Sequence, residues 1–210
     1  MSNIKKLSVV EPVCKICRRH REKLFLKGAR CETAKCSFEK RNFPPGPKSV
    51  APKKLSEYGR RLREKQKLRF FYGVSEQKMR TYFDTAKRHK GVTSEQLLSL
   101  LETRLDNVVY RVGLGLSRRD ARQMVRHRRI LVNGHILDVP SYRVRSGDVI
   151  TIHSQDDDAA MRFNRGESLV IPEWLVRDQS ARSFSVARMP ERSEISVAVE
   201  DLLVVEFYSQ

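Results

Sequence analysis

Residues 117–153 contain an arginine-rich amphipathic segment that leads directly into a tight hairpin signal. At about 100° per residue, Ala121, Met124 and Val125 share one side of a helix, and arginines occupy another side. Asn133-Gly134 then separates two short apolar runs, the strongest short-range signal for a two-residue hairpin. A third apolar run follows Ser146-Gly147-Asp148. A helix joined so closely to antiparallel strands predicts an α+β fold.

Positive charge is concentrated in the first half of the chain. The 210 residues carry a formal net charge of +17. Residues 1–100 hold 26 Lys and Arg against 9 Asp and Glu, whereas residues 101–210 hold 16 of each. A field of one sign over a folded surface attracts polyanions, so we expect nucleic acid as the partner and an anionic membrane surface as the weaker alternative. The sequence contains no run of about 18 apolar residues, so no membrane-spanning helix is predicted.

All four cysteines fall in one short window with the spacing C-x2-C-x13-C-x4-C, as Cys14, Cys17, Cys31 and Cys36. Four thiolates satisfy a tetrahedral structural zinc ion, so we expect zinc as a structural cofactor that fixes the basic loop between the two pairs. Two disulfides, which need an oxidising compartment, and a four-cysteine iron–sulfur cluster are the alternatives. His20 could replace one thiolate.

Proline and basic residues dominate residues 37–55, which predicts an extended linker. Three helices are expected to follow as a small bundle, over 56–72, 75–90 and from Thr93 or Ser94 to the glycines at 113 and 115. The first of these helices carries six cations that we expect to contact phosphate: Arg60, Arg61, Arg63, Lys65, Lys67 and Arg69.

The arginine side of the 118–126 helix is the other expected RNA contact. We expect Arg118, Arg119, Arg122 and Arg126 to form a phosphate clamp with Arg104 beside it, because the guanidinium group suits bidentate contact with phosphate. Gln123, His127, Asn133 and Tyr142 complete the predicted RNA-binding set.

The run S-R-R-x-A-R-Q-M-V-R-H-x-x-I-x-V-N-G, with P-S-Y-x-V-x-x-G-D after it, resembles the helix–hairpin RNA-binding motif named after small-subunit ribosomal protein four. L-K-G-x-R-C, R-L-R-E-K-Q-K-L-R, L-E-T-R-L-D-N-V-V-Y-R and V-V-E-F-Y-S are similar to the bacterial form of that ribosomal-protein family, in the family's order. Two parts depart: Pro47-Lys48 follows Gly46 where the family commonly has another turn, and residues 154–195 fit weakly.

The resemblance implies a zinc-bound N-terminal extension (1–46) and a small helical domain (47–101) joined by the C-terminal segment at about 196–210. An antiparallel-sheet RNA-binding domain (102–195) would carry the motif at about 102–153. The family is a structural constituent of the small ribosomal subunit. It binds a multi-helix junction of small-subunit ribosomal RNA, nucleates assembly of the subunit body and contributes to translational accuracy.

The resemblance also implies the partners. They are small-subunit ribosomal RNA, the neighbouring small-subunit ribosomal proteins three, five and twelve, and mRNA near the entry channel, on the cytoplasmic ribosome. No membrane, DNA or enzymatic activity is expected. Two rivals stay open: a zinc-ribbon nucleic-acid-binding regulator, and an RNA-modifying enzyme related to pseudouridine synthases, whose catalytic segment Arg104-Leu105-Asp106 resembles. No separate catalytic domain of about 150 residues remains for the second rival.

Overall fold

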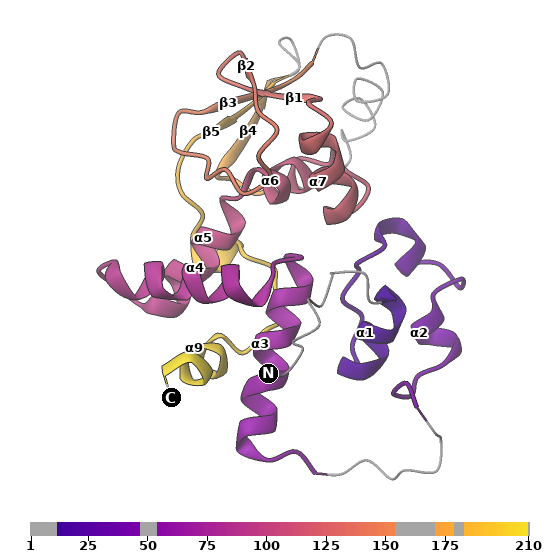
Figure 1. The fold of residues 1–210 in the computed structure, drawn as a ribbon. Coiled ribbons are helices and arrows are strands. Elements are labelled where there is room, and N and C mark those ends of the chain that lie inside the picture. Colours follow the sequence, from indigo (N-terminus) through magenta and orange to yellow (C-terminus); the bar gives the residue numbers. More distant parts are fainter. Residues whose placement is uncertain (1–11, 47–53, 154–170, 179–182, 210) are drawn as a thin grey trace, which may run out of the picture.

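A computed structural model describes residues 12–46, 54–153, 171–178 and 183–209 (Figure 1). Its N-terminal extension contains α1 (Val13–His20), the 3-10 turn η1 (Gly28–Cys31) and α2 (Ser37–Lys40). The extension lies beside the long helix α3 (Glu57–Phe71). The predicted extended linker is wrong at its start, where residues 37–40 form α2, and part of it (47–53) lies outside the described residues.

The helical domain is built from α3, α4 (Glu76–Arg88), α5 (Thr93–Glu102) and the C-terminal helix α9 (Asp201–Ser209). The Ser56 and Ser75 hydroxyls cap α3 and α4, as predicted, by accepting backbone N–H bonds of 3.2 and 3.4 Å. The chain returns to this domain at its end, because Tyr208 stacks on Phe83 with ring centroids 5.0 Å apart. Apolar side chains from all four helices share one core.

The third predicted helix is interrupted. α5 ends at Glu102, and α6 (Leu105–Arg111) begins after Arg104, whose backbone is extended. Segment 140–144 runs alongside this break: the Leu105 and Asp106 N–H groups donate to the carbonyls of Tyr142 and Pro140, and the Val144 N–H donates to Thr103. The predicted continuous helix is therefore wrong, because long-range backbone bonds replace the bonds inside the helix.

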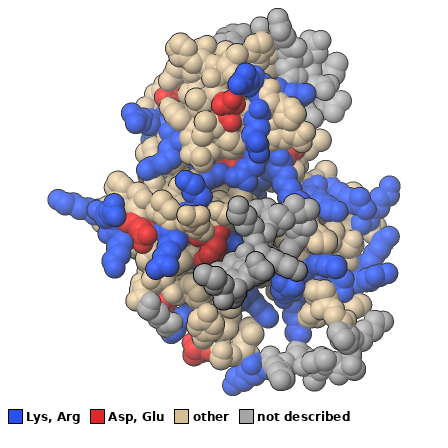
Figure 2. All heavy atoms as spheres, viewed as in Figure 1, with Lys and Arg blue, Asp and Glu red and all other residues tan. Residues whose placement is uncertain are grey.

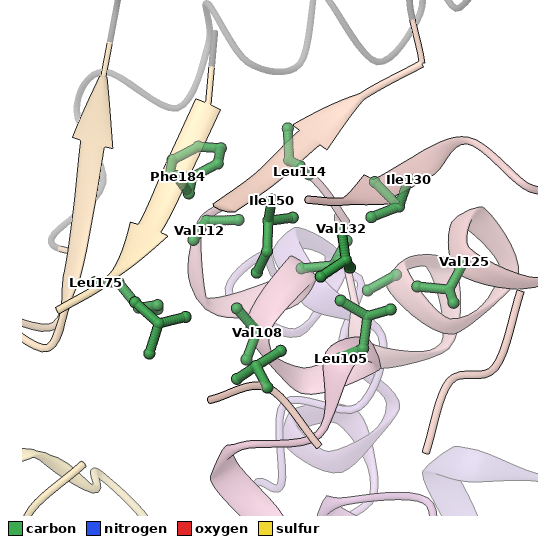
Figure 3. Close-up of a cluster of buried hydrophobic side chains, with 14 of the residues drawn as sticks. Leu105, Val108, Val112, Leu114, Val125, Ile130, Val132, Ile150, Leu175 and Phe184 are labelled. Carbon is green, nitrogen blue, oxygen red and sulfur yellow. The ribbon is translucent and has the colours of Figure 1, made fainter. Parts of the chain in front are cut away.

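The second core lies between α6, α7 (Arg118–Arg126) and an antiparallel sheet in the order β2-β1-β3-β5-β4. The strands are β1 (Ile130–Val132), β2 (His135–Ile136), β3 (Val149–Ile152), β4 (Leu175–Asp178) and β5 (Ser183–Val186). Side chains from α6, α7 and the sheet converge in Figure 3. This confirms the α+β class. The hairpin is also confirmed, since Asn133 and Gly134 have φ values of 52° and 80°, as a type I′ turn requires.

Within the described ranges, no helix is both long and apolar enough to cross a membrane. The turn η3 (Arg192–Glu194) precedes the return to α9. The acidic run 156–158 lies outside the described residues.

Candidate nucleic-acid interface

Helix α7 presents two different sides, because its apolar side is used by the sheet-domain core. Ala121, Met124 and Val125 are buried there, as predicted. The Ser117 hydroxyl caps the helix by accepting the Asp120 N–H at 3.2 Å. Arg119, Gln123, Arg126 and His127 are exposed to solvent. These four side chains therefore stand where a ligand could reach them.

Arg118 and Arg122 turn toward the C-terminal end of α3 and are only partly exposed. Arg104 lies farther inside, with 2% of its surface exposed. Its guanidinium donates to both oxygens of Asp106, at 3.0 and 2.8 Å, and to the Tyr82 hydroxyl at 2.6 Å. A cation that is buried and paired in this way is costly to uncover. The structure thus pairs Arg104 inside the fold with Asp106, which also pairs with Arg122 at 3.1 Å, and the predicted RNA contact of Arg104 stays a prediction.

Asn133 and Tyr142 also serve the fold. The Asn133 side chain donates to Asp148 at 2.9 Å and accepts the Val149 N–H at 2.8 Å, which ties the hairpin turn to the start of β3. Tyr142 is partly buried against the sheet-domain core. Neither arrangement tests the predicted RNA contacts, which stay predictions.

The six predicted cations of α3 separate into inner and outer groups. Lys65 and Lys67 are buried, with Lys65 paired to Glu76 at 2.9 Å and Lys67 paired to Glu22 and Glu64 at 2.9 and 3.1 Å. Arg61 pairs with Glu206 of α9 at 2.8 Å. Arg69 is mostly covered, with 15% of its side chain exposed. Arg60 is exposed and lies 3.7 Å from the exposed Glu57, and Arg63 is partly exposed, so a ligand can reach both.

The RNA-binding residues predicted from the sequence do not include the cations of the extension. Figure 2 shows Lys and Arg gathered over the extension and along the boundary between the sheet domain and the helices. Within residues 12–46 of the extension, the exposed cations are Lys15, Arg19, Arg21, Lys27, Arg30, Lys35, Lys40 and Arg41. Their signal was the charge asymmetry of the first hundred residues, which does not rank individual side chains.

The four cysteines lie in the extension and none of them is in a disulfide, with Cys17, Cys31 and Cys36 buried. Burial raises the pKa of the Cys17 thiol above its usual value, and the Cys31, Cys14 and Cys36 sulfurs raise it further. A backbone hydrogen bond with Leu24 lowers this pKa but does not cancel the increase. The donor set thus fits zinc chemically. Among the described residues, however, the structure gathers no group of three or more His, Cys, Asp or Glu side chains that could hold a metal ion.

His20 lies between the extension and α3. Its ring meets Phe70 edge-on, with centroids 6.0 Å apart, and only 9% of its surface is exposed. Burial, together with Arg63, Lys67 and Arg19 nearby, lowers its pKa to about 4. A neutral imidazole packed against Phe70 makes His20 part of the contact between the extension and α3.

Comparison with known proteins agrees with this architecture. Residues 9–102 match the family model described as the ribosomal protein S4/S9 N-terminal domain, and residues 103–150 match the S4 domain. These matches define a ribosomal protein that carries an S4 RNA-binding domain.

Relatives extend the match to nearly the whole chain. "Small ribosomal subunit protein uS4" of Dictyoglomus turgidum is 48% identical over 203 residues, covering 95% of this chain and 97% of that protein. The protein of the same name from Halothermothrix orenii is 47% identical over 203 residues, with 95% and 97% covered. That from Trichlorobacter lovleyi is 45% identical over 204 residues, with 96% and 98% covered. The chain belongs to the uS4 family of small ribosomal subunit proteins.

Proposed function

We propose that this chain is a structural protein of the small ribosomal subunit that binds ribosomal RNA through one basic surface. The observation that carries the proposal is the outward side of α7, where exposed Arg119 and Arg126 stand on a helix fixed by a buried apolar side. Folded RNA is recognised largely by its shape and backbone, which a rigid array of cations can match. Family membership supports the same conclusion.

The proposed surface combines three parts of the chain. It consists of Arg119, Gln123, Arg126 and His127 on and after α7, Arg60 and Arg63 on α3, and the exposed cations of the extension. Phosphate contacts release counterions, so each cation that reaches RNA adds to affinity and to its salt dependence. A junction of several RNA helices offers phosphates on more than one side, which suits a surface spread over three parts.

The finer roles rest on the family to which the chain belongs. We propose that the protein acts on the cytoplasmic ribosome, where it helps to nucleate the subunit body, influences accuracy, and lies beside small-subunit ribosomal proteins three, five and twelve and the mRNA entry path. An RNA-modifying enzyme is not favoured, because the matched relatives carry the names of ribosomal proteins and Arg104 and Asp106 pair with each other inside the fold.

We also propose that Cys14, Cys17, Cys31 and Cys36 bind one structural zinc ion. Support comes from the four cysteines outside any disulfide in one small unit, whose own core contains little besides Ile16, Cys17 and Leu24. Zinc binding contributes about 10–16 kcal/mol of apparent free energy in such small units, enough to order them.

Metal analysis tests the zinc site. Purified protein should contain one zinc per chain, and the double variant Cys31→Ser/Cys36→Ser should contain none. The control is Ser37→Ala, a change at a partly exposed position next to Cys36 that removes no thiol, and it should keep the metal. Iron with a visible absorption band, or a metal-free chain with a protected extension, would contradict the zinc proposal.

Charge reversal tests the RNA surface. Arg126→Glu and Arg119→Glu should each weaken binding to a small-subunit ribosomal RNA junction fragment by at least about tenfold, because a phosphate ligand becomes a repelling carboxylate. Lys87→Glu is the matched control: it makes the same charge change at an exposed position near the end of α4. If all three variants lose affinity equally, only net charge matters and the proposed surface is wrong.

A further inference from the structure

Arg118 is enclosed by aromatic rings from two different domains. Its guanidinium carbon lies 3.7 Å from the ring centroid of Phe71, at the end of α3, and 4.3 Å from that of Tyr110, in α6. Its Nε donates to the Asn107 side chain at 3.0 Å. A planar guanidinium over two aromatic rings gains cation–π attraction from each, and an ammonium group cannot stack in this way.

Arg122, one turn further along α7, bridges the same two domains. Its Nη1 donates to the Gly73 carbonyl after α3 at 2.7 Å, and its Nε pairs with Asp106 of α6 at 3.1 Å. Asp106 is also the partner of Arg104, which reaches Tyr82 of α4. The guanidinium of Arg122 therefore contacts both domains: it binds the Gly73 carbonyl of the helical domain and the Asp106 carboxylate of the sheet domain.

A buried carboxylate completes this contact. Glu102, with 1% of its surface exposed, accepts the Tyr72 hydroxyl of the helical domain at 2.5 Å. It also accepts Arg111 at 2.9 and 2.7 Å and Asn107 at 2.7 Å. We call the set Phe71, Tyr72, Gly73, Glu102, Asp106, Asn107, Tyr110, Arg111, Arg118 and Arg122 the interdomain joint.

We propose that Arg118 and Arg122 are positioning residues of the interdomain joint, which hold α7 on the end of α3, and that they are not phosphate ligands. This inference rests on the proposed RNA surface and divides its arginines into two kinds. Arg119 and Arg126 face outward to RNA, while Arg118 and Arg122 fix the angle at which the α7 and α3 cations are presented. Binding is stronger when that arrangement exists before RNA arrives, because the ordering cost is already met.

The two roles predict different salt behaviour. Losing a phosphate ligand lowers the slope of log affinity against log salt by about 0.7–0.9 per contact, and losing a positioning residue leaves the slope unchanged. If the joint opens so that only a tenth of the molecules are competent, the apparent Kd rises about tenfold at every salt concentration.

The experiment measures binding of the full chain to a small-subunit ribosomal RNA junction fragment across a potassium chloride series. Arg118→Lys keeps the charge but loses the stacking plane, so it should weaken binding about tenfold, as Arg118→Met does, with the wild-type slope. Arg126→Met should reduce the slope. If Arg118→Lys binds like wild type and Arg118→Met lowers the slope, Arg118 is a phosphate ligand and the inference is overturned.

Phe71→Leu gives an uncharged test on the other side of the joint. It removes one ring face from Arg118 and changes no charge, so a weaker affinity at constant slope supports the joint, and unchanged affinity contradicts it. Fluorophores at exposed Lys78 and His135 report the domain arrangement in the free protein. Their distance distribution should broaden in Arg118→Lys and Phe71→Leu but not in Arg126→Met. A narrow distribution in all variants would overturn the joint.

The two proposals fail in different ways. If the wild-type chain ignores the RNA, the proposed function is wrong, and the distance measurement still decides whether Arg118 holds the domains together. If the wild type binds and the distance distribution stays narrow in Arg118→Lys, the RNA surface stands and the positioning role is wrong.

Discussion

Glu102 shows how one buried charge connects the two halves of the fold. Its carboxylate is 1% exposed and holds partners from both domains. Burial raises its pKa, but the hydrogen bonds and positive charge of Arg111 outweigh burial and hold the pKa below the usual value. Sequence reasoning identified the surrounding run L-E-T-R-L-D-N but could not assign its charges inward, because a charged residue near the end of a predicted helix normally faces water.

Removing this charge should destabilise the protein. Glu102→Gln leaves Arg111 without its carboxylate, so the free energy of unfolding should fall by about 3–5 kcal/mol. Urea unfolding at neutral pH measures it, and Glu95→Gln at an exposed position is the control, expected to change little. If the free energy of unfolding falls by less than about 1 kcal/mol, Arg111 does not depend on the Glu102 charge and the expected effect is contradicted.

The pH dependence has a definite sign. Because the folded-state pKa of Glu102 lies below the unfolded one, its contribution is present at neutral pH and is lost as the pH falls through the lowered value. The difference in unfolding free energy between wild type and Glu102→Gln should therefore shrink in acid. A difference that grows below about pH 4 would contradict the assigned shift.

Among the elements, the caps and the hairpin were predictable and the break between α5 and α6 was not. The Ser56 and Ser75 caps and the backbone turn at Asn133-Gly134 depend on residues at most a few positions away, so the local sequence is sufficient. The break depends on backbone bonds to segment 140–144, about 40 residues further along the chain, which periodicity cannot show. For the same reason the sequence could identify the α3 cations but could not divide them into buried and exposed ones. Lys67 pairs with Glu22 and Lys65 with Glu76 only in the folded protein.

The contact between the extension and the sheet domain gives a prediction at this scale. Gly28 has a φ of 63°, and a Cβ there would lie 1.9 Å from the Leu116 carbonyl oxygen beside α7. Gly28→Ala should therefore loosen the extension by more than about 1 kcal/mol, seen as faster hydrogen exchange over α1 and α2. Gly46→Ala is the control, because φ is also positive there but nothing lies within 4 Å. If both variants exchange equally fast, the positive φ alone explains the effect and the predicted clash of the Gly28→Ala methyl group with Leu116 is contradicted.

At the scale of the whole molecule, the charge asymmetry predicted a polyanionic partner, and the motif order predicted the family to which the chain belongs. Neither could show which cations face outward, because that depends on how the extension, the helical domain and the sheet domain pack. In the folded chain, exposed cations cover the extension and the outward side of α7. Covered cations tie the parts together, since Lys67 of α3 pairs with Glu22 of the extension and Arg122 of α7 donates to the Gly73 carbonyl after α3.

The most direct measurement of the central claim is a hydrogen-exchange comparison of the chain alone and bound to small-subunit ribosomal RNA. The account predicts slower exchange over the basic loop of the extension, the N-terminal half of α3 and residues 118–129. Slowing confined to β4 and β5, or none in those three segments despite tight binding, would contradict it.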